Sequence, residues 1–94
     1  MAYGRKKRTY YKQHFNDLSI NIPWKDWVYI LTKHYRFEMI LKSGSIRAFE
    51  RGGIKFIAHE PHGGGDDFVH RYDRKKSIRA IEMLKTLEEI GGIE

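Results

Sequence analysis

The sequence predicts a small α+β domain in which one helix, a three-stranded antiparallel sheet and a second helix follow one another along the chain. Apolar residues recur at helical spacing over residues 22–34 and again after Asp73, and three short runs with alternating apolar residues lie between them. Tight turns that contain glycine separate these runs, which favours consecutive antiparallel strands. Both helices are expected on one face of the sheet, because neither the sheet nor an amphipathic helix has another surface against which to bury its apolar side.

The length and composition of the chain restrict its class. Its 94 residues suit one domain with a modest core. Cysteine is absent, so the chain has no disulfide, no thiolate metal site and no cysteine nucleophile. No apolar run approaches the ~20 residues that span a bilayer, and the first residues lack the apolar region of a signal peptide. These observations predict a cytoplasmic protein with no membrane partner.

Residues 1–19 are expected to form a basic, flexible tail, and residues 20–94 the folded domain. The tail carries +4 of the net charge of +6, with four consecutive cations from Arg5 to Arg8 and three tyrosines around them. This composition is typical of an arm that binds nucleic-acid phosphates and stacks on bases. A solvated tail without a partner and a cloning remnant at the first positions are the alternatives. Its removal is expected to leave the fold intact, because the apolar helical pattern begins only at Trp24.

The first helix is expected over residues 22–34. Asn21 can cap its start, and Pro23 suits its first turn. The spacing of its apolar stripe assigns both tryptophans to the core in preference to base stacking. The stripe consists of Trp24, Trp27, Val28 and Leu31.

Three strands are expected next, and the second leaves one question open. The turns between them contain Ser43-Gly44 and Arg51-Gly52-Gly53. Ala48 and Phe49 lie on opposite sides of the second strand, so the pattern does not decide which face is buried. The three strands are expected over residues 36–42, 46–49 and 54–59.

The closing helix is expected to begin at Asp73, a good N-cap, and to end at Gly91-Gly92. Its apolar residues recur every third position, which predicts one buried stripe. The stripe consists of Ile78, Ile81, Leu84 and Leu87, widened by Met83 and Ile90.

The densest functional chemistry lies where the third strand ends. Pro61 cannot donate to a strand ladder, so the strand should end there and leave His59 and His62 near the surface, before the loop Gly63–Gly65. Metal-free RNA cleavage needs a base for the ribose 2′-hydroxyl and an acid for the leaving 5′-oxygen. Imidazole, with an ordinary pKa of ~6.5, can perform either proton transfer. His59 and His62 could divide these two roles and are the candidate catalytic residues.

Basic side chains near these histidines are candidates for phosphate binding. Some lie on the neighbouring strands, and others gather at the start of the last helix. The alternative is that one histidine merely closes the strand and the cations face solvent. The candidates are Lys42, Arg47, Lys55, Arg71, Arg74, Lys75 and Lys76.

A metal-binding hydrolase or nuclease is a further alternative for the same region. Five imidazole and carboxylate side chains lie within twelve residues, and the flexible glycine loop could let them converge on a metal ion. Their spacing matches no tight zinc pattern. The five are His59, His62, Asp66, Asp67 and His70.

The order of elements resembles the small double-stranded-RNA-binding-like (dsRBD-like) fold, and residues 20–92 are similar to the HicA family of toxins from bacterial toxin–antitoxin pairs. The matching features are Trp24, the Gly44-Ser45 turn, Phe49, the run His59-Glu60-Pro61-His62 and the closing helix. The resemblance implies a metal-independent, cofactor-free ribonuclease that cleaves messenger RNA and is silenced by a HicB-like antitoxin protein. Because the Gly44-Ser45 turn belongs to the family pattern, Ser45 joins the candidate RNA-binding residues.

One position departs from the family pattern. Members often carry the active histidine directly after the Gly-Ser turn, and this chain has Ile46 there. The departure keeps a second function open, a non-catalytic RNA-binding module on the same fold.

Overall fold

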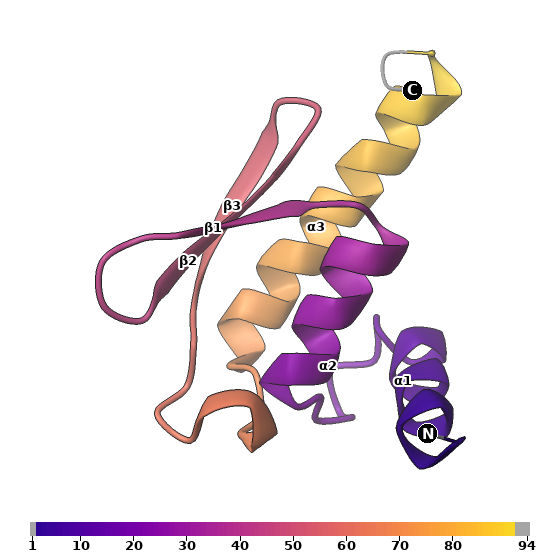
Figure 1. Cartoon of the computed structure of the whole chain (residues 1–94). Coiled ribbons are helices and arrows are strands. Elements are labelled where there is room, and N and C mark those ends of the chain that lie inside the picture. Colours follow the sequence, from indigo (N-terminus) through magenta and orange to yellow (C-terminus); the bar gives the residue numbers. More distant parts are fainter. Residues whose placement is uncertain (1, 92–94) are drawn as a thin grey trace.

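The computed structural model describes residues 2–91, with side chains from Lys7 onward, as a three-stranded sheet with helices packed against it (Figure 1). The predicted α+β class is confirmed. Within residues 2–91, no helix is long and apolar enough to cross a membrane. The elements are α1 (Ala2–Gln13), α2 (Trp24–Tyr29), the π-helical turn η1 (Ile30–His34), β1 (Glu38–Leu41), β2 (Ile46–Arg51), β3 (Ile54–His59), the 3-10 turn η2 (Gly64–Asp66) and α3 (Arg71–Glu89).

The sheet is an antiparallel meander with the strand order β1-β2-β3. Strands β2 and β3 pair continuously from Arg51 opposite Ile54 to Ile46 opposite His59. The two residues between them, Gly52 and Gly53, have φ angles of 58° and 85°. A two-residue turn with positive φ at both positions matches the twist of the flanking strands, and glycine adopts it without strain. The predicted hairpin is therefore confirmed.

The core lies between the sheet and the two helices α2 and α3, which lie side by side on one face of it (Figure 1). Trp27 is fully buried, and its ring centroid lies 5.4 Å from that of Phe49 and 6.2 Å from that of Phe56. Its Nε1 donates to Ser77 Oγ at 3.3 Å, which joins α2 to α3. Trp24 packs beside it, so the assignment of both tryptophans to the core is confirmed.

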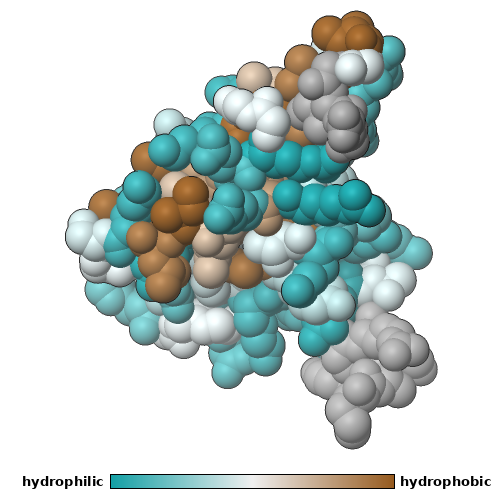
Figure 2. Space-filling view, turned by 45° about the horizontal axis from the view of Figure 1, so that its top comes forward, coloured by the Kyte–Doolittle hydropathy of each residue, from teal (hydrophilic) through white to brown (hydrophobic). Residues whose placement is uncertain are grey.

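Strand β2 buries residues on both of its faces. Phe49 faces the helices and packs against the aromatic rings of the core. Ala48 points to the other face but is also fully buried, because it lies on the central strand between its partners Ile40 and Ile57. Ile57 is 41% exposed on that outer face. Hydrophobic residues gather on the left of the molecule in Figure 2, where Figure 1 places the sheet.

The expectation of an unstructured tail outside the domain is wrong for the described part of residues 1–19. Residues 2–13 form α1, and Phe15 is 3% exposed within the core. Tyr11 packs against the same core, one helical turn before Phe15. This apolar pair at i, i+4 spacing indicates a helix that packs on the core. The many cations around it suggest a solvated tail instead. The side chains of Arg5 and Lys6, predicted to bind phosphate, lie outside the described residues.

The two predicted N-caps are also wrong. Pro23 occupies the N-cap position of α2 and His70 that of α3, and neither end has a capping side-chain hydrogen bond. At α2 the acceptor comes from the segment after η2 instead, because the N–H of Trp24 donates to the carbonyl of Asp67 at 2.7 Å. Asn21 is therefore left exposed. Asp73 lies inside the first turn of α3 and is only 3% exposed.

The stripe of α3 is narrower than expected. Ile81 and Leu84 are buried, whereas Met83 is 50% and Ile90 is 73% exposed, so these two residues do not widen it. Gly91, with a φ of 76°, follows the helix and allows the left-handed conformation common after a C-terminus. Gly92, the other half of the predicted stop signal, lies outside the described residues.

Candidate functional site

The turn before β2 and the exit of β3 form one continuous surface. Ile46 pairs with His59 in the sheet, and the N–H of Glu60 donates to the carbonyl of Ser45 at 2.9 Å. A side-chain ion pair reinforces this contact, because Arg47 Nη2 lies 3.0 Å from Glu60 Oε1. Antiparallel pairing thus brings the Gly44-Ser45 turn beside the histidine-bearing segment, although thirteen residues lie between Ser45 and His59 in the sequence.

The two histidines lie at the surface where β3 ends. The strand ends at His59, the following Pro61 is buried, and both His59 and His62 are exposed, as expected. The N–H of Gly64 donates to the carbonyl of Pro61 at 3.0 Å, so a tight turn carries His62. Neither imidazole forms a side-chain hydrogen bond or ion pair with another described residue. Both rings therefore remain available to a substrate.

The start of α3 closes the free edge of β3 next to His59. Asp73 Oδ2 accepts a hydrogen bond from the backbone N–H of His59 at 3.0 Å. Lys76 Nζ donates to the carbonyl of Ile57 at 2.7 Å and lies 3.6 Å from Asp73 Oδ1. These two side chains satisfy backbone groups that an edge strand otherwise leaves open. Lys76, a predicted phosphate ligand, is thus engaged in joining α3 to the sheet.

Arg47 is also engaged within the protein. Besides its ion pair with Glu60, Arg47 Nη1 donates to the carbonyls of Gly44 and Ile46, each at 2.9 Å. Its side chain is only 17% exposed. These contacts hold the turn against the exit of β3. They also engage the N–H donors of the guanidinium, and Glu60 offsets its charge, so Arg47 is poorly suited to bind a phosphate.

The prediction that Arg74 binds phosphate is wrong. Arg74 is 2% exposed, and its Nη2 donates to the carbonyls of Phe15 at 2.8 Å and Asp17 at 3.0 Å. Its Nη1 donates to the carbonyl of Ile20. Burial lowers the pKa of the guanidinium, Asp17 opposes this shift, and the charge of Arg71 adds to it. Arg74 therefore fastens the segment after α1 to α3.

The remaining candidates for phosphate or RNA binding lie in different parts of the fold. Lys42 is exposed and adjoins the turn, since its N–H donates to the carbonyl of Ile46 at 3.0 Å. Lys55 pairs with Glu50 near the opposite end of β3, four residues from His59, and is not part of the same cluster. The exposed candidates are Lys42 and Ser45 at this end of the sheet, and Arg71 and Lys75 in the first turns of α3.

Asp66 and Asp67, the two carboxylates considered for a metal site, have other contacts. Asp67 Oδ1 accepts from the N–H of Phe68 at 2.8 Å, and its Oδ2 accepts from the N–H of Gly63 at 3.2 Å. Asp66 forms an ion pair with Lys25 at 2.7 Å, and this hydrogen-bonded contact lowers the pKa of its carboxyl. Across the residues whose side chains are described, no three histidine or carboxylate side chains converge as metal ligands would.

The sequence did not reveal what three acidic residues contact in the folded chain. Asp73 and Glu60 became recognisable only from the backbone groups and cations that they contact. Asp26 had no local signal, because it lies on the side of α2 away from the tryptophan stripe. It is only 7% exposed because α1 packs there and brings Arg8 within 3.6 Å of it. A carboxylate at such a position requires polar partners.

Comparisons with protein-family models, with curated proteins and with solved structures gave no match. The surface formed by the Gly44-Ser45 turn and the exit of β3 is therefore the basis for a functional proposal.

Proposed function

We propose that this chain is a metal-independent endoribonuclease that cleaves messenger RNA, a toxin of the HicA type on a dsRBD-like fold. The observation that carries the proposal is the contact of the Gly44-Ser45 turn with the histidine-bearing exit of β3, through the carbonyl of Ser45 and the N–H of Glu60. A proton-transfer site needs groups fixed by the fold but open to the substrate. His59 and His62 meet both conditions.

The chemistry divides between the two imidazoles. In the proposed reaction, one neutral imidazole takes the proton from the ribose 2′-hydroxyl, whose oxygen attacks the adjacent phosphorus. The other imidazole, protonated, gives a proton to the departing 5′-oxygen, so that a 2′,3′-cyclic phosphate and a free 5′-hydroxyl form. Negative charge grows on the phosphate during attack, and nearby exposed cations stabilise it. The exposed cations available for this role are Lys42 beside the turn and Arg71 and Lys75 in the first turns of α3.

A non-catalytic RNA-binding module is the second candidate, and Ile46 favours it. This residue pairs with His59 at the position where HicA proteins often carry a histidine, so an apolar side chain stands beside the candidate base. Electrophoresis of a 5′-labelled RNA, with binding measured in parallel, separates the two functions. A ribonuclease binds and shortens the RNA, whereas a binding module binds it and leaves its length unchanged.

The cations of α3 give a prediction for RNA affinity. Replacing Lys75 with glutamine should weaken RNA binding and lower the slope of log affinity against log salt by about 0.7 for single-stranded RNA, the value for one lost phosphate contact. The matched control is Lys85→Gln, which removes an exposed lysine further along the same helix. Equal slopes for the Lys75 variant and the wild type would remove this part of α3 from the proposed RNA surface.

A HicB-like antitoxin is the protein partner that the proposal requires, because an active toxin must be restrained. The outer face of the sheet suits such a partner, since His59 shares it with the exposed Ile57. Acidic groups on the partner would complement the exposed cations and speed association. We expect hydrogen exchange of a complex with the antitoxin to show new protection at the turn before β2 and at the exit of β3. Protection confined to α2 would contradict occlusion of the site.

A further inference from the structure

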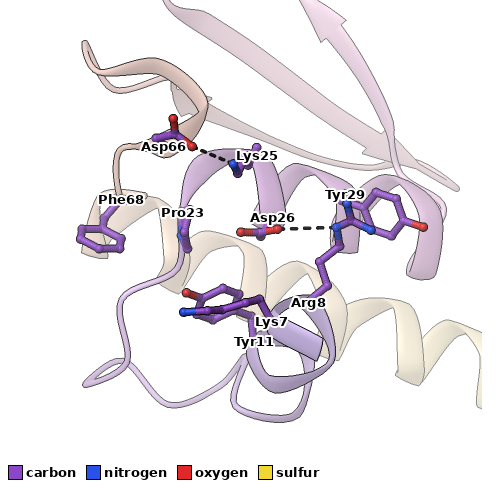
Figure 3. A pocket seen from close by; sticks show the side chains of 9 residues that line it. All are labelled: Lys7, Arg8, Tyr11, Pro23, Lys25, Asp26, Tyr29, Asp66 and Phe68. Atoms are coloured by element: carbon purple, nitrogen blue, oxygen red, sulfur yellow. Dashed lines mark ion pairs between the residues drawn. The ribbon is translucent and has the colours of Figure 1, made fainter. Parts of the chain in front are cut away.

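A cavity lies between α1, α2 and residues 66–68 (Figure 3), with a volume of about 460 Å³. Small-ligand pockets commonly fall between about 300 and 1,000 Å³. Helix α1 supplies one wall, so this cavity exists only because residues 7–11 are folded against α2. Its lining combines aromatic rings, cations and carboxylates: Lys7, Arg8, Tyr11, Pro23, Lys25, Asp26, Tyr29, Asp66 and Phe68.

The aromatic side chains of the cavity are exposed on a fixed backbone. Phe68 is 48% exposed, although its backbone is held by a β-bridge to Pro23. Its N–H also donates to the carboxylate of Asp67. On the opposite side, the guanidinium of Arg8 lies 4.1 Å from the ring centroid of Tyr29. Figure 3 shows these two side chains next to each other. Because the backbone that carries Phe68 is already held, stacking a flat ligand on its ring orders less of the chain.

The charged groups of the cavity favour an anionic ligand that also carries hydrogen-bond donors. Three cations face two carboxylates, which leaves a net positive charge. Asp26 is 7% exposed, and its Oδ1 lies 3.6 Å from Arg8 Nε. A buried carboxylate is an acceptor only, so it selects a group with N–H donors. A nucleotide meets these requirements with its flat base, its donor-bearing edge and its phosphate.

We propose that this cavity binds one unstacked base of a single-stranded RNA, stacked on Phe68 with its edge N–H groups donating to Asp26. The inference rests on the proposed function, since it extends the RNA surface. Single-stranded RNA is commonly recognised by splayed bases that stack on aromatic side chains and bond through their edges. The segment that follows His62 ends at Phe68, in the wall of the cavity. Guanine, with two adjacent donors on its edge, fits the carboxylate best.

The test measures the affinity of the full chain for a short RNA of each base composition by fluorescence anisotropy. Phe68→Ala should weaken binding about 5- to 150-fold, the usual loss for one stacked base. The matched control is Met83→Ala, which removes an equally exposed apolar side chain between β3 and α3. Asp26→Asn should reduce the preference for guanine over the other bases more than it reduces overall affinity.

The outcomes separate this inference from the proposed function. Wild type that binds RNA while Phe68→Ala binds it equally well overturns the base pocket and leaves the ribonuclease proposal standing. Wild type that binds no RNA overturns both. If Phe68→Ala instead abolishes capture of the protein partner with RNA affinity unchanged, the cavity is a protein-docking site and the base pocket is wrong.

Discussion

Replacing either His59 or His62 by alanine is expected to slow RNA cleavage about 100- to 10,000-fold, the usual contribution of one general acid or base. RNA affinity should change little, because a neutral imidazole adds no charge to phosphate contacts. The double variant should lose less than the product of the two single losses, since residues that act as a unit are not additive. Single-turnover cleavage of a defined RNA measures all three effects.

The matched control for these variants is His70→Ala, which removes an exposed imidazole just before α3. It should cleave within a few-fold of the wild type. If both the His59 and the His62 variants cleave as fast as the His70 variant, the two histidines have no catalytic role. If only one of the two variants cleaves more slowly, that histidine performs one proton transfer, and water or a different residue performs the second.

Replacing Arg74 by methionine is expected to lower the free energy of unfolding by about 3–5 kcal/mol, comparable to breaking a buried charged contact. Methionine retains much of the apolar stem but leaves three carbonyls, those of Phe15, Asp17 and Ile20, without their donor. A small domain has only about 5–15 kcal/mol of total stability. Urea denaturation followed by tryptophan fluorescence should therefore show a large shift of the midpoint, because both tryptophans lie in the core.

Arg79→Met is the matched control, since this arginine is exposed on the same helix. Its midpoint should stay close to that of the wild type. Removal of residues 1–19 should destabilise the domain at least as much as Arg74→Met. It deletes the buried side chain of Phe15 and two of the three carbonyls that accept from the guanidinium, those of Phe15 and Asp17. A truncated chain as stable as the full chain would show that α1 and the segment after it contribute nothing to the fold.

Local patterns were enough to predict the sheet and the exposure of the histidines. The Gly52-Gly53 pair predicted the β2–β3 hairpin. Two glycines between alternating runs favour a two-residue turn with positive φ at both positions, which is the common hairpin turn. Pro61 ended β3 for an equally local reason, its missing N–H. Helical spacing likewise assigned Trp24 and Trp27 to the core.

The errors came from contacts between distant parts of the chain. Arg74 looks like any cation at the start of a helix, and only the fold brings it to carbonyls 54 to 59 residues earlier. Asp73 has the residue type of an N-cap, but the edge of β3 offers its carboxylate a backbone N–H instead. The positive charge of residues 1–19 predicted a flexible tail and not helix α1. The pair Tyr11 and Phe15 gains its energy only against the rest of the core.

The most direct test of the proposed function is the chemistry of the RNA ends that the protein leaves. A defined RNA and a copy with 2′-deoxyribose at the cleaved position are incubated with the protein in excess chelator. Proton transfer by His59 and His62 predicts that the RNA is cut to a 2′,3′-cyclic phosphate and a 5′-hydroxyl, and that the 2′-deoxy copy stays intact. Cleavage of both substrates, cleavage only after a divalent metal is added, or binding without cleavage would contradict it.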